Sequence, residues 1–195
     1  YLSGQGIAAA QDTYFSNYIA QTGEPLLWMA IYVGLTAIIV YFGVQKGVEK
    51  ASRFMMPALI ILSIGVAIYS VTRPGALAGV AYFLIPDFSR FSANTVLGAM
   101  GQMFYSLSLA MGIMVTYGSY MKQEDDLEKS VAQIEVFDTA IAFLAGMMII
   151  PAVFSYSGGD ESALNKGAGL MFVTLPKVFA DAGTLGQIFG GVFFL

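Results

Sequence analysis

The sequence has 195 residues, of which 57% are hydrophobic and 11% are charged, and its mean hydropathy is +0.71. Ordinary soluble domains carry roughly 25% charged residues, so this composition excludes a typical soluble globule and indicates a membrane protein. The sequence lacks Cys and His, which excludes disulfide, thiol and imidazole chemistry. A net charge of -4 without a basic cluster argues against a nucleic-acid partner.

The first half of the chain predicts two membrane spans. Residues 1–24 are mixed and polar and begin with neither Met nor a signal-peptide pattern, so we expect an internal fragment that opens on a loop or short surface helix. An uncharged span follows from Pro25 to Gln45, and a second runs from Phe54 to Thr72 with Pro57 in its first turn. The connection between them is basic, which predicts the cytoplasmic face: Lys46, Lys50 and Arg53.

A charge-free run from Phe91 to Met121 follows a predicted external loop, Gly75 to Arg90, whose IPDF segment predicts a short turn. As one helix, the run would measure roughly 45 Å, against about 30 Å for the hydrocarbon core of a bilayer. Small and hydroxylated residues interrupt it between Ser106 and Gly112, which predicts an unwound, ligand-binding break. The alternative is helix packing, in which the serines bond to carbonyls one turn back and the glycines allow close contact.

A further span is predicted from Ser130 to Tyr156, after a solvated connection in which Asp125 and Lys129 pair one helical turn apart. Asp138 lies within this span, where a carboxylate is costly unless it is paired, protonated or bound to a cation. It is therefore a functional candidate, and the alternative is a solvated residue near the membrane interface. Next, LMFVTLPKVFADAG predicts an external helical hairpin, and a final span begins near Thr184.

The stretch GQMFYSLSLAMG, followed by TYGSYM, resembles the sixth transmembrane helix of the neurotransmitter:sodium symporter family, especially its bacterial amino-acid transporters. The resemblance covers nearly the whole chain, including KGVEKASRFMMP, IPDFSRF and GLMFVTLPKVF. It implies an all-α polytopic membrane protein, part of a LeuT-type inverted-repeat transporter with a discontinuous helix near Ser106 to Gly112. Residues 1–195 would then be a partial transporter domain that holds an external loop, family helices 4 to 7, the large external loop and the start of helix 8.

The resemblance also implies the site residues. Tyr105 matches an aromatic lid, Met111 matches a pocket position that is often aromatic, and Ala110 departs from a frequent Gly. The substrate-binding residues implied in this way are Tyr105, Ser108, Ala110, Met111 and Gly112. The sodium ligands implied are Ser106 and Asp138, the latter replacing the Asn of many relatives, and the remnant of an anion site falls on Gln102 and Ala142.

The implied function is sodium-coupled symport of an amino acid, apolar or aromatic, into the cell by alternating access, with no enzymatic reaction. Because Asp138 supplies a carboxylate beside the sodium ligands, chloride is not expected to be required. The expected partners are the amino acid, sodium and the lipid bilayer of the cell (inner) membrane, which the protein would cross several times. One alternative is an intramembrane enzyme, but a catalytic Ser–Lys pair would need a Lys within a span, and every Lys lies in a connection between spans. The other is a structural membrane subunit, which would leave Asp138 without a role.

Overall fold

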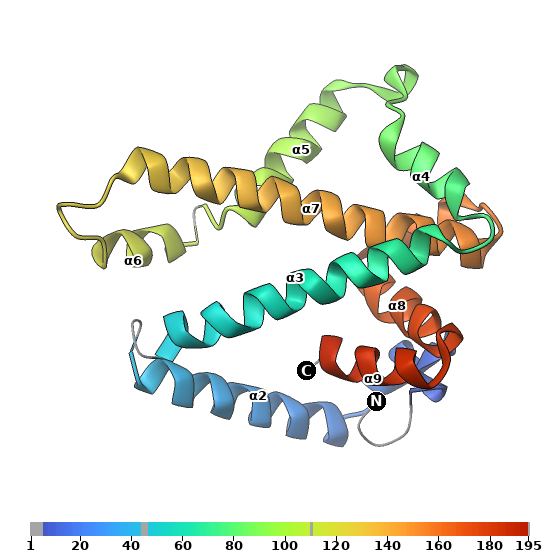
Figure 1. Cartoon of the computed structure of the whole chain (residues 1–195), viewed down its shortest axis with the longest axis horizontal. Helices are drawn as coiled ribbons and strands as arrows, with labels where there is room; N and C mark the ends of the chain where they lie inside the picture. The colour runs from blue at the N-terminus through green and yellow to red at the C-terminus, as the bar shows by residue number, and fades with distance from the viewer. Residues whose placement is uncertain (1–5, 44–46, 110, 195) are drawn as a thin grey trace. The chain divides into compact units, whose positions relative to one another are not determined.

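The computed structural model describes residues 6–43, 47–109 and 111–194, and for residues 165–168 it describes the backbone alone. Lys46, the first charge of the predicted basic turn, and Ala110, a predicted substrate contact, therefore lie outside the described residues. The described chain is built from helices (Figure 1). In chain order these are η1 (Ala8–Ala10), α1 (Tyr14–Ile19), α2 (Gly23–Tyr41), α3 (Glu49–Val71), α4 (Ala76–Leu84), η3 (Phe88–Arg90), α5 (Ala93–Ser106), α6 (Ile113–Ser119), α7 (Leu127–Ser157), η4 (Glu161–Gly169), α8 (Leu170–Asp181) and α9 (Gly183–Phe193).

Three of these helices, α2, α3 and α7, are long and apolar enough to cross a membrane. They coincide with three predicted spans, although α3 begins several residues earlier than expected. Its first turns are charged, and Glu49 pairs with Arg53 one turn later at 2.7 Å. This pair stabilises helical turns that precede the apolar residues. Pro57 consequently lies inside α3, so its predicted place in the first helical turn is wrong.

Helix α4 occupies much of the predicted external loop and was not expected from the sequence. It packs closely on the second half of α7, because a Cβ added at Gly79 would lie 2.8 Å from Pro151 Cα. Ser155 Oγ also donates a hydrogen bond to the Pro74 carbonyl at 2.9 Å, which joins the end of α3 to α7. Absence of a side chain at Gly79 thus lets two backbones meet, a packing role that local sequence does not reveal.

The predicted turn at IPDF is present as η3. Asp87 precedes it, and its Oδ1 accepts hydrogen bonds from the backbone N–H of Ser89 at 3.0 Å and from the Ser89 hydroxyl at 2.5 Å. These bonds, together with Arg90, hold the pKa of the Asp87 carboxyl below its ordinary value. The segment is therefore an ordered turn before the broken helix.

Helix α7 starts with a cap from Asp126, whose Oδ1 accepts a hydrogen bond from the backbone N–H of Lys129 at 3.1 Å. Such a cap satisfies an amide that has no partner within the helix. Asp125 Oδ2 accepts from the backbone N–H of Lys122 at 2.8 Å, in the connection before α7. Since α7 begins at Leu127, Asp125 precedes it, and the predicted pairing of Asp125 with Lys129 along one helix is wrong.

The predicted hairpin in LMFVTLPKVFADAG is also wrong, because residues 170–181 form the single helix α8 with Pro176 inside it. A proline within a helix costs about 3 kcal/mol, whereas burying one large apolar side chain gains about 1.5–3 kcal/mol. Leu175, Val178 and Phe179 are each at most 3% exposed, so their burial outweighs the proline. The turn falls instead before α9, close to the predicted start at Thr184.

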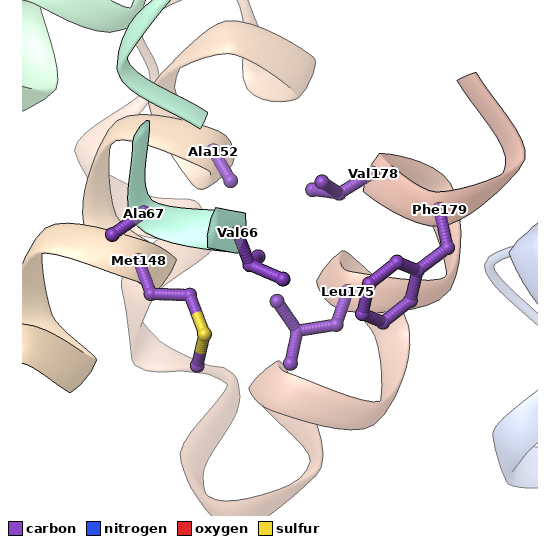
Figure 2. Packing of buried hydrophobic residues seen from close by; sticks show 7 residues of the cluster. All are labelled: Val66, Ala67, Met148, Ala152, Leu175, Val178 and Phe179. Atoms are coloured by element: carbon purple, nitrogen blue, oxygen red, sulfur yellow. The ribbon is translucent and has the colours of Figure 1, made fainter. Parts of the chain in front are cut away.

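The chain divides into two compact units, residues 84–143 and residues 1–83 with 144–195. Figure 2 shows the core of the second of these units, where side chains of α3, α7 and α8 converge. The cluster comprises Val66, Ala67, Met148, Ala152, Leu175, Val178 and Phe179. This core anchors α8 to two membrane-spanning helices.

Candidate functional site

The candidate site begins where α5 ends. The backbone N–H of Ser108 donates to the Tyr105 carbonyl at 3.1 Å, and that of Leu109 donates to the Phe104 carbonyl at 2.9 Å. This pair of bonds is a Schellman motif, which ends a helix at a residue in the left-handed conformation. That residue is Ser108, with φ +54°, where glycine is usual. The predicted break is confirmed, and its start is fixed by backbone hydrogen bonding.

The break ends at a second left-handed residue, Gly112, which has φ +76° and caps α6. Both the backbone N–H and the hydroxyl of Thr116 donate to the Gly112 carbonyl at 3.0 Å. Thr116 was not among the predicted residues, although a Thr four residues after Gly112 has the spacing for this bond. Two left-handed residues therefore bracket the unwound segment, in unit 84–143.

Asp138 of α7 contacts the end of α5. Ser106, the last residue of α5, donates from Oγ to Asp138 Oδ1 at 2.5 Å across 32 positions of sequence. Asp138 is half-buried and Ser106 is exposed within this chain. The carboxylate and the carbonyl end of α5 both contribute negative potential at this place, because a helix C-terminus carries about half a negative charge. Such a place favours a cation bound by hard oxygen ligands.

The other predicted residues lie on or beside the break. Tyr105 is in the last turn of α5 and is 69% exposed, whereas Met111 is in the unwound segment and is 50% exposed. Gln102 lies one turn before Ser106, and Ala142 lies one turn after Asp138. The structure thus joins Ser106 directly to Asp138 and leaves Tyr105, Met111, Gln102 and Ala142 exposed within this chain.

We expect Gly112→Ala to lower the unfolding temperature (Tm) of the full-length protein in detergent. A side chain in the left-handed region costs roughly 1–2 kcal/mol, although the space around Gly112 is open. Gly118→Ala is the matched control, because Gly118 has ordinary helical geometry and open space in α6, where Ala is preferred over Gly. Equal Tm values for the two variants would contradict a conformational requirement at Gly112.

Comparison with known proteins gives consistent matches. The model of the sodium:neurotransmitter symporter family matches residues 10–195. An uncharacterized sodium-dependent transporter of Bacillus subtilis is 36% identical over 97% of this chain and 40% of its own length. Another, from Methanocaldococcus jannaschii, is 38% identical over 83% of this chain and 34% of its own.

Among solved structures, that of MhsT in complex with L-phenylalanine matches with a TM-score of 0.83 and 38% identity, over 97% of this chain and 44% of MhsT. The chain thus spans less than half the length of these relatives. The structural match agrees with the predicted all-helical, LeuT-type fold, and the two relatives above are named as sodium-dependent transporters. The chain belongs to the sodium:neurotransmitter symporter family.

Proposed function

We propose that this chain is the middle part of a sodium-coupled symporter that carries an apolar or aromatic amino acid into the cell. The observation that carries the proposal is the contact between Ser106 Oγ and Asp138 Oδ1 at the break between α5 and α6. Two matched relatives are named as sodium-dependent transporters, and MhsT was solved with L-phenylalanine. Membership of a transporter family excludes the intramembrane enzyme as an alternative.

In this proposal, sodium binds between the hydroxyl of Ser106 and the carboxylate of Asp138. The Ser106 hydroxyl would keep its proton and turn it away from Asp138, so that its oxygen and the carboxylate oxygen could both face the cation. A carboxylate within a membrane span is costly when unpaired, and sodium would lower that cost. Since the ligands belong to different helices, sodium would fix the end of α5 against α7 and so define the substrate-ready state.

The substrate would lie at the unwound segment. The backbone N–H and C=O groups of this segment do not all bond within a continuous helix, so some can bind a substrate. The side chains of Tyr105 and Met111 supply an aromatic face and an adaptable apolar surface. The proposed substrate contacts in the described residues are Tyr105, Ser108, Met111 and Gly112. An amino acid with an apolar or aromatic side chain fits this chemistry best.

The proposed carrier does not need chloride. Asp138 provides a negative charge within the site, and Ala142, one turn further on α7, has no donor for an anion. Gln102, one turn before Ser106, is then a remnant of an anion site that the carboxylate has replaced.

The proposal also assigns this chain a place in the membrane. It represents helices 4 to 7 of the family with adjoining external loops and the start of helix 8, in the cell (inner) membrane. Residues 46–53 and 122–129 would face the cytoplasm, because basic residues concentrate in short connections on that side. Residues 75–90 and 158–183 would then face outward.

Uptake by the full-length protein in proteoliposomes tests the function. Accumulation of radiolabelled phenylalanine, leucine and tyrosine is measured with an inward sodium gradient and with choline in its place. We expect at least one of them to accumulate only with sodium. Equal accumulation in both conditions would refute coupling, and no uptake of any would refute the substrate class.

Met111→Phe is expected to narrow the accepted substrates, because a rigid ring replaces a flexible thioether in the proposed pocket. The ratio of leucine uptake to tryptophan uptake measures the effect in the full-length protein. Met103→Phe is the control, since Met103 lies in α5 before the break and is 48% exposed, compared with 50% for Met111. If both variants kept the wild-type ratio, Met111 would not line the pocket.

A further inference from the structure

Helix α4 directs small residues and one aromatic ring at α7. A Cβ added at Gly79 would lie 2.8 Å from Pro151 Cα of α7, so the two backbones meet there. One turn later, Phe83 lies against Gly146 of α7, where an added Cβ would lie 2.4 Å from the ring of Phe83. Ala76, which is 0% exposed, lies on the same side of α4, three residues before Gly79. A residue with little or no side chain thus stands at each contact, which is typical of helices that pack together within a membrane.

The opposite side of α4 carries apolar side chains that are exposed within this chain. Leu77 is 73% exposed and Leu84 is 49% exposed, and their spacing of seven residues places both on one side of the helix. Ala81 lies between them and is also exposed, and Ile85, directly after α4, is 69% exposed. A continuous apolar surface of this kind marks contact with a membrane or with a protein.

The chemistry of the segment favours lipid as the partner of this exposed side. Helices that meet within a membrane place small residues at the contact, whereas α4 directs its small residues at α7 and bulky leucines away from it. Leucine is among the side chains that enter a bilayer most readily. Residues 74–86 carry no charge, so the whole segment around α4 is compatible with apolar surroundings.

Charged residues at both ends of this segment limit how deep α4 can lie. Arg73, before α4, pairs with Asp181, and Asp87, after α4, pairs with Arg90 at 3.1 Å. Ionised groups are costly in the hydrocarbon core, so we expect both ends to stay at the level of the lipid headgroups. A short helix held in this way lies along the interface and does not cross the membrane.

We propose that α4 lies in the interface of the bilayer, with Leu77 and Leu84 in contact with lipid acyl chains. At about 1.5 Å per residue, Pro151 lies about 9 Å along α7 from its last residue, Ser157, and interfacial helices bury their apolar face by about 5–10 Å. The contact of Gly79 with Pro151 therefore places α4 at a suitable depth beside a helix that is long and apolar enough to cross the membrane. The proposal requires α7 to cross the membrane, and it depends on neither sodium nor substrate.

The test measures what surrounds the exposed side of α4 in the full-length protein, freed of other cysteines and reconstituted in vesicles of phosphatidylethanolamine and phosphatidylglycerol. Leu77→Cys and Leu84→Cys are each labelled with a nitroxide, and power saturation compares its collisions with oxygen, which concentrates in hydrocarbon, and with a water-soluble nickel complex. We expect oxygen to be the more frequent collision partner at both positions. Ser162→Cys is the control, because Ser162 is exposed in η4 beside the charged Asp160 and Glu161, and there the nickel complex should be the more frequent partner.

More frequent collisions with the nickel complex at Leu77 and Leu84 would mean an aqueous loop, and rare collisions with both reagents would mean that other helices of the transporter cover α4. Either result would overturn the proposal. A second arm needs no label: Leu77→Asp should lower the Tm in vesicles, since a carboxylate in lipid is costly, while Leu77→Phe should leave it unchanged. Equal Tm values for Leu77→Asp and the wild type would also overturn it. Sodium-independent uptake would refute the proposed function and leave lipid contact at α4 standing.

Discussion

Replacing Asp138 with Asn in the full-length protein is expected to raise the sodium concentration that gives half-maximal uptake about 10- to 100-fold. The basis is that a bond to a charged group contributes about 1.5–3 kcal/mol. The physical reason is that an amide keeps the shape of the side chain and removes the charge that would balance sodium. Ser106 Oγ, now 2.5 Å from Asp138 Oδ1, would remain without the carboxylate. The measurement is the initial rate of uptake as a function of sodium concentration.

The same experiment, carried out in chloride and in gluconate, tests the predicted independence from chloride. Wild-type uptake should be equal in the two anions. Recovery of Asp138→Asn by chloride alone would mean that a free anion can replace the carboxylate, which supports the same electrostatic account. A wild type that needs chloride, or a variant with normal sodium affinity in both anions, would refute the role of Asp138.

Glu135→Gln is the matched control for this prediction. Glu135 lies on α7 about one turn before Asp138 and is exposed, while Asp138 is half-buried. Neutralising Glu135 should leave sodium dependence close to that of the wild type, because an exposed charge is already solvated. An equal loss in both variants would point to the overall charge of α7 instead of the contact with Ser106.

Leu175→Ala is expected to destabilise the full-length protein by about 2–5 kcal/mol, the usual cost of truncating a fully buried leucine. Leu175 is 0% exposed and packs among side chains of α3, α7 and α8 (Figure 2). The loss combines removed apolar contact with a cavity that the packed helices cannot fill. Thermal unfolding in detergent, followed by circular dichroism, measures the fall in Tm.

Leu127→Ala serves as its control, because Leu127 is the first residue of α7 and is 62% exposed. The same change of side chain should therefore lower Tm much less. If both leucines gave the same fall in Tm, the cluster in Figure 2 would not be the part of the molecule that secures α8.

The sequence by itself determined the membrane class, three long apolar helices and the position of the break. Runs without charge can be recognised in the sequence itself, and the run from Phe91 to Met121 is longer than one spanning helix needs. Small residues between Ser106 and Gly112 marked where that helix ends. These features depend on composition and local spacing, so a linear reading captures them.

Tertiary structure alone decided the contacts between distant residues and the conformations that local preference opposes. Ser106 meets Asp138, 32 positions away in the sequence, only because α7 passes the end of α5. Pro176 remains inside α8 because burial of its apolar neighbours outweighs the lost hydrogen bond. The sequence specifies which segments prefer to be helices, while the free energy of packing decides where those helices continue and which polar groups they bring together.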